Sequence, residues 1–289
     1  AFLREKYPQV ELLASRENVG FCVANNRMVE LARGEHVLLL NNDAALFPDA
    51  LATLADAAAQ QPPPGILTLP QYDWETGDLV DRGCLLDPFY NPVPNMDPMR
   101  SEVAMVIGAC FWIGRETWEL LGGFPEWFES IGEDLYLCCA TRLVGRKVEV
   151  TNVSGYLHRQ GHSFGGNKVD SQNLVSSYRR RRLSERNKSY VLFIMTPPTL
   201  TWPILCTHII LLLLEGFILS VAEMNFRPMK EIYINALTSL WQNREALREH
   251  QRGIRKSASI EWLEYFSAFK IWPRKLTMLR KYGWPYLRG

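Results

Sequence analysis

The sequence lacks the features that would place it in several common classes. Its 289 residues carry a formal net charge of only +1, which argues against a general nucleic-acid binder. None of the six cysteines forms a C-x-x-C pair and most lie in apolar runs, so we expect buried free thiols in a reducing compartment. No signal peptide and no internal repeat is found, and we expect the sequons at Asn152 and Asn187 to carry no glycan.

Apolar residues make up 47% of the chain, enough for the core of one large domain or two ordinary ones. Short apolar runs at residues 10–14, 36–40 and 66–69 alternate with helical periodicity at residues 21–33 and 48–60. This alternation predicts an α/β fold with a parallel sheet and right-handed crossovers.

The alternation changes after residue 70. Residues 72–82 predict a hairpin, and residues 83–100, which are rich in Pro, Asn and Asp, predict a loop over the sheet edge. Residues 105–113 predict a buried strand whose small Gly108 and Ala109 allow a ligand to approach closely. A further strand is expected at residues 147–152.

The strand at residues 36–40 runs directly into Asn41, Asn42 and Asp43. Ligands of open α/β sheets bind at the carboxyl ends of the strands. A carboxylate with two amides beside it suits Mg²⁺ or Mn²⁺ carrying a diphosphate. From this stretch alone, a polar turn that leads into the next helix is the favoured interpretation.

Two other clusters are candidates for chemistry. Glu133 and Asp134 fall in the first turn of a predicted helix, where the macrodipole keeps carboxylates ionised. They are either ordinary helix-start residues or a general base at the sheet edge. His158 and His162 lie four residues apart in a glycine-containing loop after a strand, which favours a metal or phosphate site over two solvated side chains.

The C-terminal third is basic and apolar. Arg179–Arg182 precede an apolar segment at residues 190–222, whose densest part, residues 204–222, is long enough to span a bilayer. Placing Glu215 in the middle of a bilayer would cost free energy, so an interfacial helix on an anionic membrane surface fits better. Packing on the domain or on a partner, and a true span, are the alternatives. Amphipathic helices are expected at residues 230–251 and 260–281.

In their order and spacing, several segments resemble an inverting glycosyltransferase of family 2, and within it the rhamnosyl- and galactofuranosyltransferases of bacterial surface polysaccharides. The matching segments span roughly residues 1–165. They are residues 16–21 with Asn25 and Asn26, residues 34–43, residues 108–110 with Arg115 and Glu116, residues 122–124, residues 133–138, His158 and residues 161–163.

The resemblance implies a GT-A fold, a Rossmann-like and mostly parallel sheet flanked by helices, at residues 1–168. It also implies a helical, membrane-associating tail at residues 169–289. Members of this family begin with a strand and an acidic loop that seat the nucleotide. These would precede Ala1, so the domain is expected to be N-terminally truncated.

The resemblance also assigns roles. Asp43, with His158, would hold a divalent metal, Mn²⁺ or Mg²⁺, and Asn41 replaces the first acid of the family's metal motif. Asp134 would be the catalytic base, with Glu133 beside it. The remaining residues would contact the substrates: Asn18, Gly20, Asn25, Asn41, Asn42 and Asp43 the nucleotide-sugar donor, and Gly108, Ala109, Cys110 and His162 the donor sugar or the acceptor.

The implied activity is transfer of a sugar from a nucleoside diphosphate to a hydroxyl of a glycan or lipid-linked glycan. We expect a cytoplasmic protein, peripheral on the inner face of a bacterial cell membrane through residues 178–225, with a homo-oligomer left open. A non-catalytic membrane-surface scaffold is the main alternative. A phosphoesterase that uses Asp43, His158 and His162 would need more His and Asp ligands than the chain offers.

Overall fold

The computed structural model describes residues 2–60, 65–159, 168–170, 173–284 and 286–288. Its main sheet has the order β1-β8-β3-β9, formed by β1 (His36–Leu40), β8 (Cys110–Gly114), β3 (Ile66–Thr68) and β9 (Val148–Val150). Strand β3 is parallel to β9, but β8 runs antiparallel to both β1 and β3.

The sheet is therefore mixed, and the predicted mostly parallel sheet is wrong in this respect. Parallel neighbouring strands need a crossover connection, which is usually a helix. Residues 69–109, which connect β3 to β8 and are all described, contain strands and loops but no helix, so β8 is free to return in the opposite direction.

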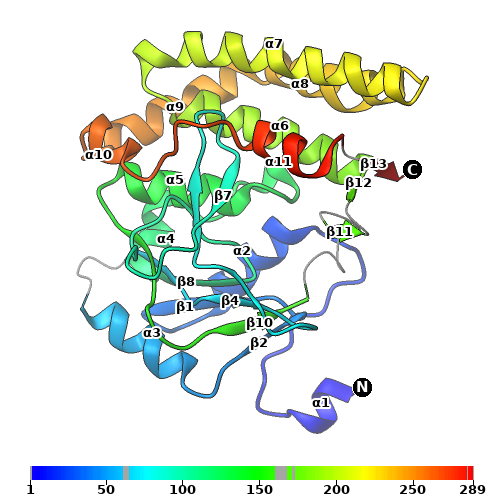
Figure 1. The fold of residues 1–289 in the computed structure, drawn as a ribbon. Helices are drawn as coiled ribbons and strands as arrows, with labels where there is room; N and C mark the ends of the chain where they lie inside the picture. The colour runs from blue at the N-terminus through cyan, green and yellow to red at the C-terminus, as the bar shows by residue number, and fades with distance from the viewer. Residues whose placement is uncertain (1, 61–64, 160–167, 171–172, 285, 289) are drawn as a thin grey trace.

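Both faces of the main sheet are buried, which explains why its strands are continuously apolar. Val37 and Leu39 of β1 pack into the larger core cluster, whereas Leu38 between them packs against the smaller one. The smaller cluster contains Leu54 of α3 (Ala50–Ala59). The larger one includes residues of α2 (Phe21–Leu31) and α5 (Glu133–Leu143), and α4 (Arg115–Leu121) packs nearby. Figure 1 shows α3 on one side of the sheet and α5 on the other.

A second sheet lies beside the first, with the order β2-β10-β4-β5. Its strands are β2 (Ala44–Leu46), β10 (Tyr156–His158), β4 (Gln71–Asp73) and β5 (Leu79–Asp81). Strands β4 and β5 are antiparallel, which confirms the predicted hairpin. Because β10 pairs with β2 so that His158 faces Ala44, the histidine lies next to Asp43.

Two local predictions are wrong. Residues 10–14 are exposed coil rather than a strand, since no described strand pairs with them, and α1 (Phe2–Lys6) before them buries no residue. Residues 83–100 are not a surface loop but contain a hairpin of β6 (Cys84–Leu86) and β7 (Pro92–Pro94). Its turn is buried because the Asp87 carboxylate accepts hydrogen bonds from the backbone N–H groups of Phe89 and Asn91, both at 2.9 Å.

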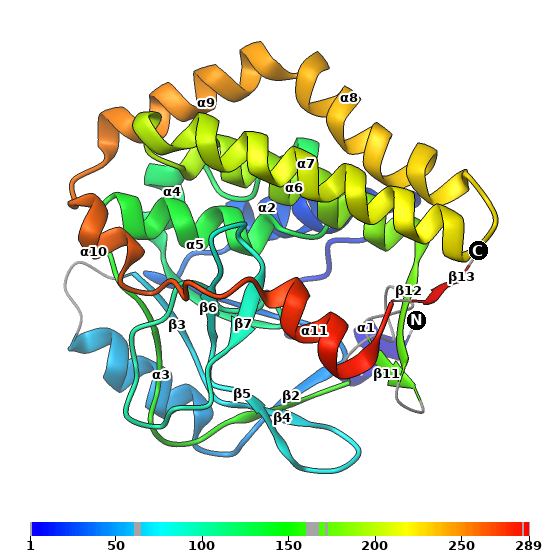
Figure 2. The same ribbon diagram turned by 45° about the horizontal axis from the view of Figure 1, so that its top comes forward.

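The C-terminal third forms a helical layer over α5 (Figures 1 and 2), in which α6 lies beneath α7 and contacts α8 and α9. The bounds are α6 (Tyr178–Met195), α7 (Pro198–Ala222), the π-helix η2 (Met229–Ile234), α8 (Asn235–Gln242), α9 (Arg244–Ser257), α10 (Trp262–Phe266) and α11 (Arg274–Tyr282). Short strands β11 (Lys168–Asp170), β12 (Asn173–Ser177) and β13 (Tyr286–Arg288) form a third sheet.

This layer shares the larger core cluster with the sheet, since Val191 and Leu192 of α6 belong to it together with Phe111 and Val148. The domain boundary at residue 168 stays a prediction. The predicted free thiols are confirmed, and all of them except the exposed Cys206 are buried.

The predicted basic cluster at the start of α6 is only partly a surface feature. Arg181 is largely buried in α6 and forms ion pairs with Glu185 of the same helix and Glu215 of α7. Since one of the four arginines is committed to the interior, the cluster is a weaker attachment for an anionic surface than the sequence indicates.

Candidate active site

Asp43 and His158 form a pair at the junction of the two sheets. Nε2 of His158 lies 3.4 Å from Oδ1 of Asp43, and both side chains are mostly buried. The other ring nitrogen, Nδ1, lies 3.2 Å from Oε1 of Gln71, which also accepts the Tyr156 hydroxyl at 2.7 Å. With Nδ1 donating to Gln71, the Nε2 lone pair faces the carboxylate.

An imidazole nitrogen beside a carboxylate oxygen is a donor set that suits Mn²⁺. Across the described ranges, no group of three or more His, Cys, Asp and Glu side chains gathers around one point. The two side chains therefore fit a cation that takes its remaining ligands from diphosphate oxygens and water, as Mg²⁺ commonly does.

Asp134 lies in the first turn of α5. Its Oδ2 accepts a hydrogen bond from the backbone N–H of Gly108 at 3.1 Å, and its Oδ1 accepts one from the N–H of Leu135 at 2.7 Å. A Cβ added at Gly108 would lie 3.6 Å from the ring of Phe21 and 3.9 Å from Cβ of Asp134, so these three residues meet at one place. Burial raises the pKa of Asp134, and the hydrogen bond from Gly108 opposes this rise.

The backbone connects the two carboxylates. The N–H of Asn41 donates to the carbonyl oxygen of Ala109 at 3.0 Å, next to the register pair of Leu40 and Cys110. The turn that carries Asp43 thus lies beside the segment that binds Asp134. The two predicted acidic groups, 91 residues apart in sequence, are brought to the same edge of the main sheet.

Glu133 is 6% exposed, and its Oε2 has no hydrogen-bond partner among the described residues. Burial and the neighbouring Asp134 raise the pKa of Glu133, and the charge of Arg180 opposes the rise at both carboxyl groups. Arg180 of α6 is therefore electrostatically part of this site, although sequence reasoning placed it in a membrane-binding cluster.

Packing of α6 explains the position of Arg180. Asn187, two turns further along the same face, donates from Nδ2 to the carbonyl oxygens of Phe128, Ser130 and Ile131 at 2.7–3.0 Å. These carbonyls immediately precede α5, so α6 is held against the start of that helix. The spacing of Arg180 and Asn187 is visible in the sequence, but its meaning depends on knowing which helix they face.

The other predicted site residues are placed as follows. Oδ1 of Asn18 accepts a hydrogen bond from the N–H of Gly20 at 3.1 Å, and Gly20 has the positive φ, 84°, that leads into α2. Asn25 is buried and donates to the carbonyl oxygen of Phe21, whereas Asn42 is exposed. Cys110 is fully buried in the smaller core cluster. Donor contacts of these residues stay predictions, and His162 lies outside the described residues.

Sequence reasoning assigned no role to Asn26. Its Oδ1 accepts from the N–H of Phe124 at 3.0 Å and its Nδ2 donates to the carbonyl oxygen of Phe124 at 2.9 Å. The two bonds tie α2 to the turn that leads to α5, so Asn26 supports the site from outside it.

A sequence model described as Glycosyl transferase family 2 matches residues 1–121. N-acetylglucosaminyl-diphospho-decaprenol L-rhamnosyltransferases from two strains of Mycobacterium tuberculosis are 26% identical over 191 residues. These alignments cover 56% of this chain and 62% of each relative, so the chain spans less than two thirds of their length.

Solved structures show a weak likeness. TarS of S. aureus is 13% identical with a TM-score of 0.47, covering 89% of this chain and 75% of that one. The mannosyltransferase PcManGT of Pyrobaculum calidifontis, in complex with GDP-Man and Mn²⁺, is 17% identical with a TM-score of 0.44, covering 88% of this chain and 70% of that one. Residues 1–121 thus match the model of glycosyl transferase family 2, and the chain is similar to the mycobacterial rhamnosyltransferases over 191 residues.

Proposed function

We propose that this chain is an inverting, metal-dependent glycosyltransferase that moves a sugar from a nucleoside diphosphate to a hydroxyl of a lipid-linked glycan acceptor in polysaccharide synthesis. The observation that carries the proposal is the meeting of Asp134, Gly108 and Phe21 beside the turn that bears Asp43. The mycobacterial relatives, whose name specifies a sugar on a diphospho-decaprenol lipid, support this class of acceptor.

Asp134 is suited to act as the general base. Its two carboxylate oxygens accept backbone hydrogen bonds, which fix the group without neutralising it, and its raised pKa makes it a better proton acceptor than a solvated aspartate. In the proposed step, it removes the proton of the acceptor hydroxyl as that oxygen attacks the anomeric carbon. The bond from that carbon to the diphosphate breaks on the opposite face, so the configuration inverts.

Asp43 and His158 would hold the divalent cation, which supplies positive charge to the leaving diphosphate when bound. Gln71 would keep the imidazole in the orientation that presents Nε2. Arg180 would limit the rise in the pKa of Asp134 and of Glu133, because its positive charge favours the ionised carboxylates in a buried site.

We also assign the chain to the inner surface of the cell membrane, through α7. By length and composition this helix is apolar enough to span a bilayer, and 33% of its most apolar window is buried inside the protein. The two side chains that would be unfavourable in lipid, His208 and Glu215, face inward. His208 contacts the Ser189 hydroxyl at 2.9 Å, and Glu215 binds Lys275 at 2.6 Å. Residues such as Phe217 and Val221, each 60% exposed, face outward, which favours lying on the membrane over crossing it.

Donor binding tests the proposal. The chain is titrated by calorimetry with a panel of uridine and thymidine diphosphate sugars, in Mn²⁺ or Mg²⁺ and again with a chelator. We expect one donor to bind only with metal, and Asp43→Ala to weaken that binding at least about tenfold, because a carboxylate ligand to the cation is lost.

Asp78→Asn is the matched control, since Asp78 is an exposed acid in the β4–β5 turn and its loss should leave donor affinity unchanged. If no donor on the panel binds in a metal-dependent way, the proposal is refuted and a non-catalytic scaffold is favoured. Binding of a donor that is indifferent to Asp43→Ala would refute the assigned metal ligand.

A further inference from the structure

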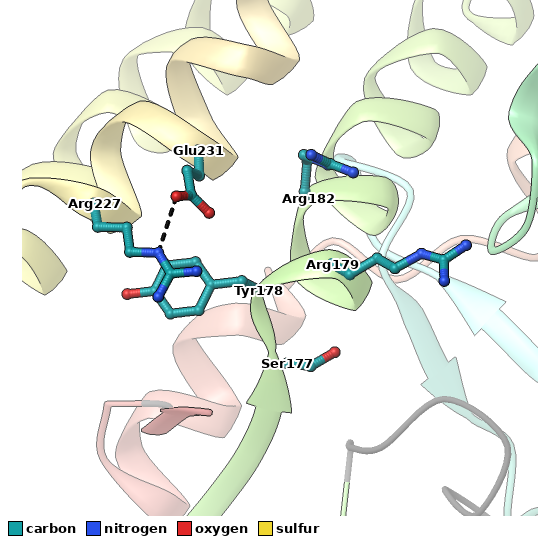
Figure 3. Close-up of a pocket in the computed structure, with 6 residues that line it drawn as sticks. All are labelled: Ser177, Tyr178, Arg179, Arg182, Arg227 and Glu231. Atoms are coloured by element: carbon teal, nitrogen blue, oxygen red, sulfur yellow. Dashed lines mark hydrogen bonds and ion pairs between the residues drawn. The ribbon is translucent and has the colours of Figure 1, made fainter. Parts of the chain in front are cut away.

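A cavity of about 270 Å³ lies where the start of α6 meets the start of η2. Figure 3 shows Arg179 and Arg182 extending to one side of the first turn of α6, with Tyr178, Arg227 and Glu231 on the other. Its lining residues are Ser177, Tyr178, Arg179, Arg182, Arg227 and Glu231. Neither the metal pair nor the catalytic base belongs to this cavity.

The lining is built for an anion. The lining carries three guanidinium groups and one carboxylate, and that carboxylate, on Glu231, pairs with Arg227. Arg179 and Arg182 lie on the other side of the helix turn from this pair (Figure 3). Arg227 is oriented in advance, because its guanidinium stacks over the Tyr178 ring at 4.3 Å and its Nε donates to Glu231 at 2.9 Å. Guanidinium groups bind phosphate oxygens in pairs, so a phosphate or diphosphate is the chemistry that this lining recognises.

The surroundings of the cavity are apolar. The chain leaving α7 for η2 passes directly from the outward face of that helix to Arg227, and it exposes Met224 by 94% and Phe226 by 62%. An anion without an apolar part would gain no binding energy from these apolar side chains. A phosphate joined to a hydrocarbon chain would place its charge among the arginines and its chain against these side chains and α7.

The cavity also adjoins the catalytic carboxylates through one helical turn. Arg179 and Arg182 are three residues apart and share a face of α6, while Arg180 between them directs its charge at Asp134 and Glu133. A lipid phosphate bound at Arg179 and Arg182 would therefore lie on the same turn of α6 as Arg180, whose charge acts on the proposed base.

We propose that this cavity binds the phosphate groups of the lipid-linked acceptor, with the lipid chain lying along the exposed face of α7. The inference rests on the proposed function, which supplies a lipid-linked acceptor. It adds the site that holds the acceptor and the residues, Arg179 and Arg182, that recognise its charge.

The test is direct binding of farnesyl diphosphate in detergent micelles, measured by calorimetry on the full chain. We expect the double variant Arg179→Gln/Arg182→Gln to weaken binding at least about tenfold, since each arginine contributes charge-assisted hydrogen bonds. The control, Arg248→Gln/Arg252→Gln on α9, removes the same charge from exposed positions and should bind like the wild type.

Each outcome separates one source of binding from another. Equal affinity in the wild type and the Arg179/Arg182 variant would overturn the proposal, as would inorganic diphosphate that binds as tightly as farnesyl diphosphate. If both double variants lose affinity for phosphatidylglycerol vesicles to the same extent, the protein is attracted to anionic lipid in general. That result would also overturn the proposal. If the wild type binds farnesyl diphosphate but no nucleotide sugar, the result would support the cavity as a lipid phosphate site and refute only the proposed function.

Discussion

The backbone N–H of Gly108 donates a hydrogen bond to Oδ2 of Asp134 at 3.1 Å, and this contact joins the start of α5 to the main sheet. Gly108 lies close against the carboxylate, because a Cβ added there would be in van der Waals contact with Phe21 at 3.6 Å and with Cβ of Asp134 at 3.9 Å. An acid that the backbone holds in a fixed position can act as a general base once a substrate hydroxyl comes within hydrogen-bonding distance.

Asp134→Asn is therefore expected to reduce sugar transfer by about 10²–10⁴-fold, the usual contribution of a positioned base. The amide is nearly the same size and its oxygen can accept one of the two backbone hydrogen bonds, so donor affinity measured by calorimetry should not change. Transfer is followed by release of the nucleoside diphosphate. Equal rates in the variant and the wild type would disprove the assignment of Asp134 as the base.

The pH dependence of transfer should depend on Arg180. Asp134 accepts a proton only when ionised, so the rate rises with pH until its carboxyl group has ionised. Burial raises the pKa of Asp134 and Arg180 opposes that rise, so Arg180→Gln should raise the pKa further and move the acidic limb of the pH–rate profile to higher pH.

Arg180→Lys, which keeps the charge, should restore the position of that limb. A purely structural role would instead lower the rate equally at all pH values. The raised pKa of Asp134 makes the native state bind more protons than the unfolded state. The free energy of unfolding therefore falls as pH rises from the ordinary pKa of an aspartate through the raised pKa. Arg180→Gln should steepen that fall, measured as the urea midpoint at a series of pH values above the ordinary pKa of an aspartate, about 3.9.

An ion-pair network fixes α7 and α11 to α6. Glu185 is 1% exposed and accepts from Nζ of Lys188 at 2.7 Å and of Lys275 at 2.8 Å. Burial alone would raise the pKa of Glu185, but the neighbouring cations outweigh it and hold this pKa well below its usual range. Its contribution is thus present at neutral pH and lost as pH falls through the lowered pKa.

Glu185→Gln should lower the free energy of unfolding at pH 7 by about 3–5 kcal/mol, because it leaves buried cations without their partner. Glu231→Gln, which breaks the exposed pair with Arg227, should cost at most about 1 kcal/mol. Urea denaturation at pH 7 measures both. Equal losses in the two variants would show that the network is no more than surface pairing.

Local pattern predicted much of this molecule. The helix that begins at Phe21 and the strand over residues 36–40 are confirmed, because each is specified by its own local pattern of apolar residues. The placement of Asp43 beside His158 agrees with the resemblance, and it depends on pairing of β2 with β10.

What the sequence could not supply is the direction of packing. Nothing in residues 83–100 reveals that Asp87 is buried, since its carboxylate is satisfied by backbone groups of its own turn. The arginines that begin α6 look alike in sequence, yet Arg181 lies in the interior, Arg180 faces the carboxylates and Arg182 lines a cavity. Only the contacts of α6 with α5 and α7 separate these roles.

The outward face of α7 provides the last prediction. Replacing Phe217 and Val221 with serine removes two large apolar groups that are each 60% exposed, so the fold should be little changed. On the membrane, burial of each such side chain is worth about 1.5–3 kcal/mol, so the double variant should bind vesicles at least about tenfold more weakly in flotation assays. Leu51→Ser/Met99→Ser, in α3 and in the segment between β7 and β8, at positions 55% and 89% exposed, is the matched control and should float like the wild type. Equal flotation of all three proteins would exclude α7 as the membrane contact, and a helix that extracts only with detergent would indicate a true span.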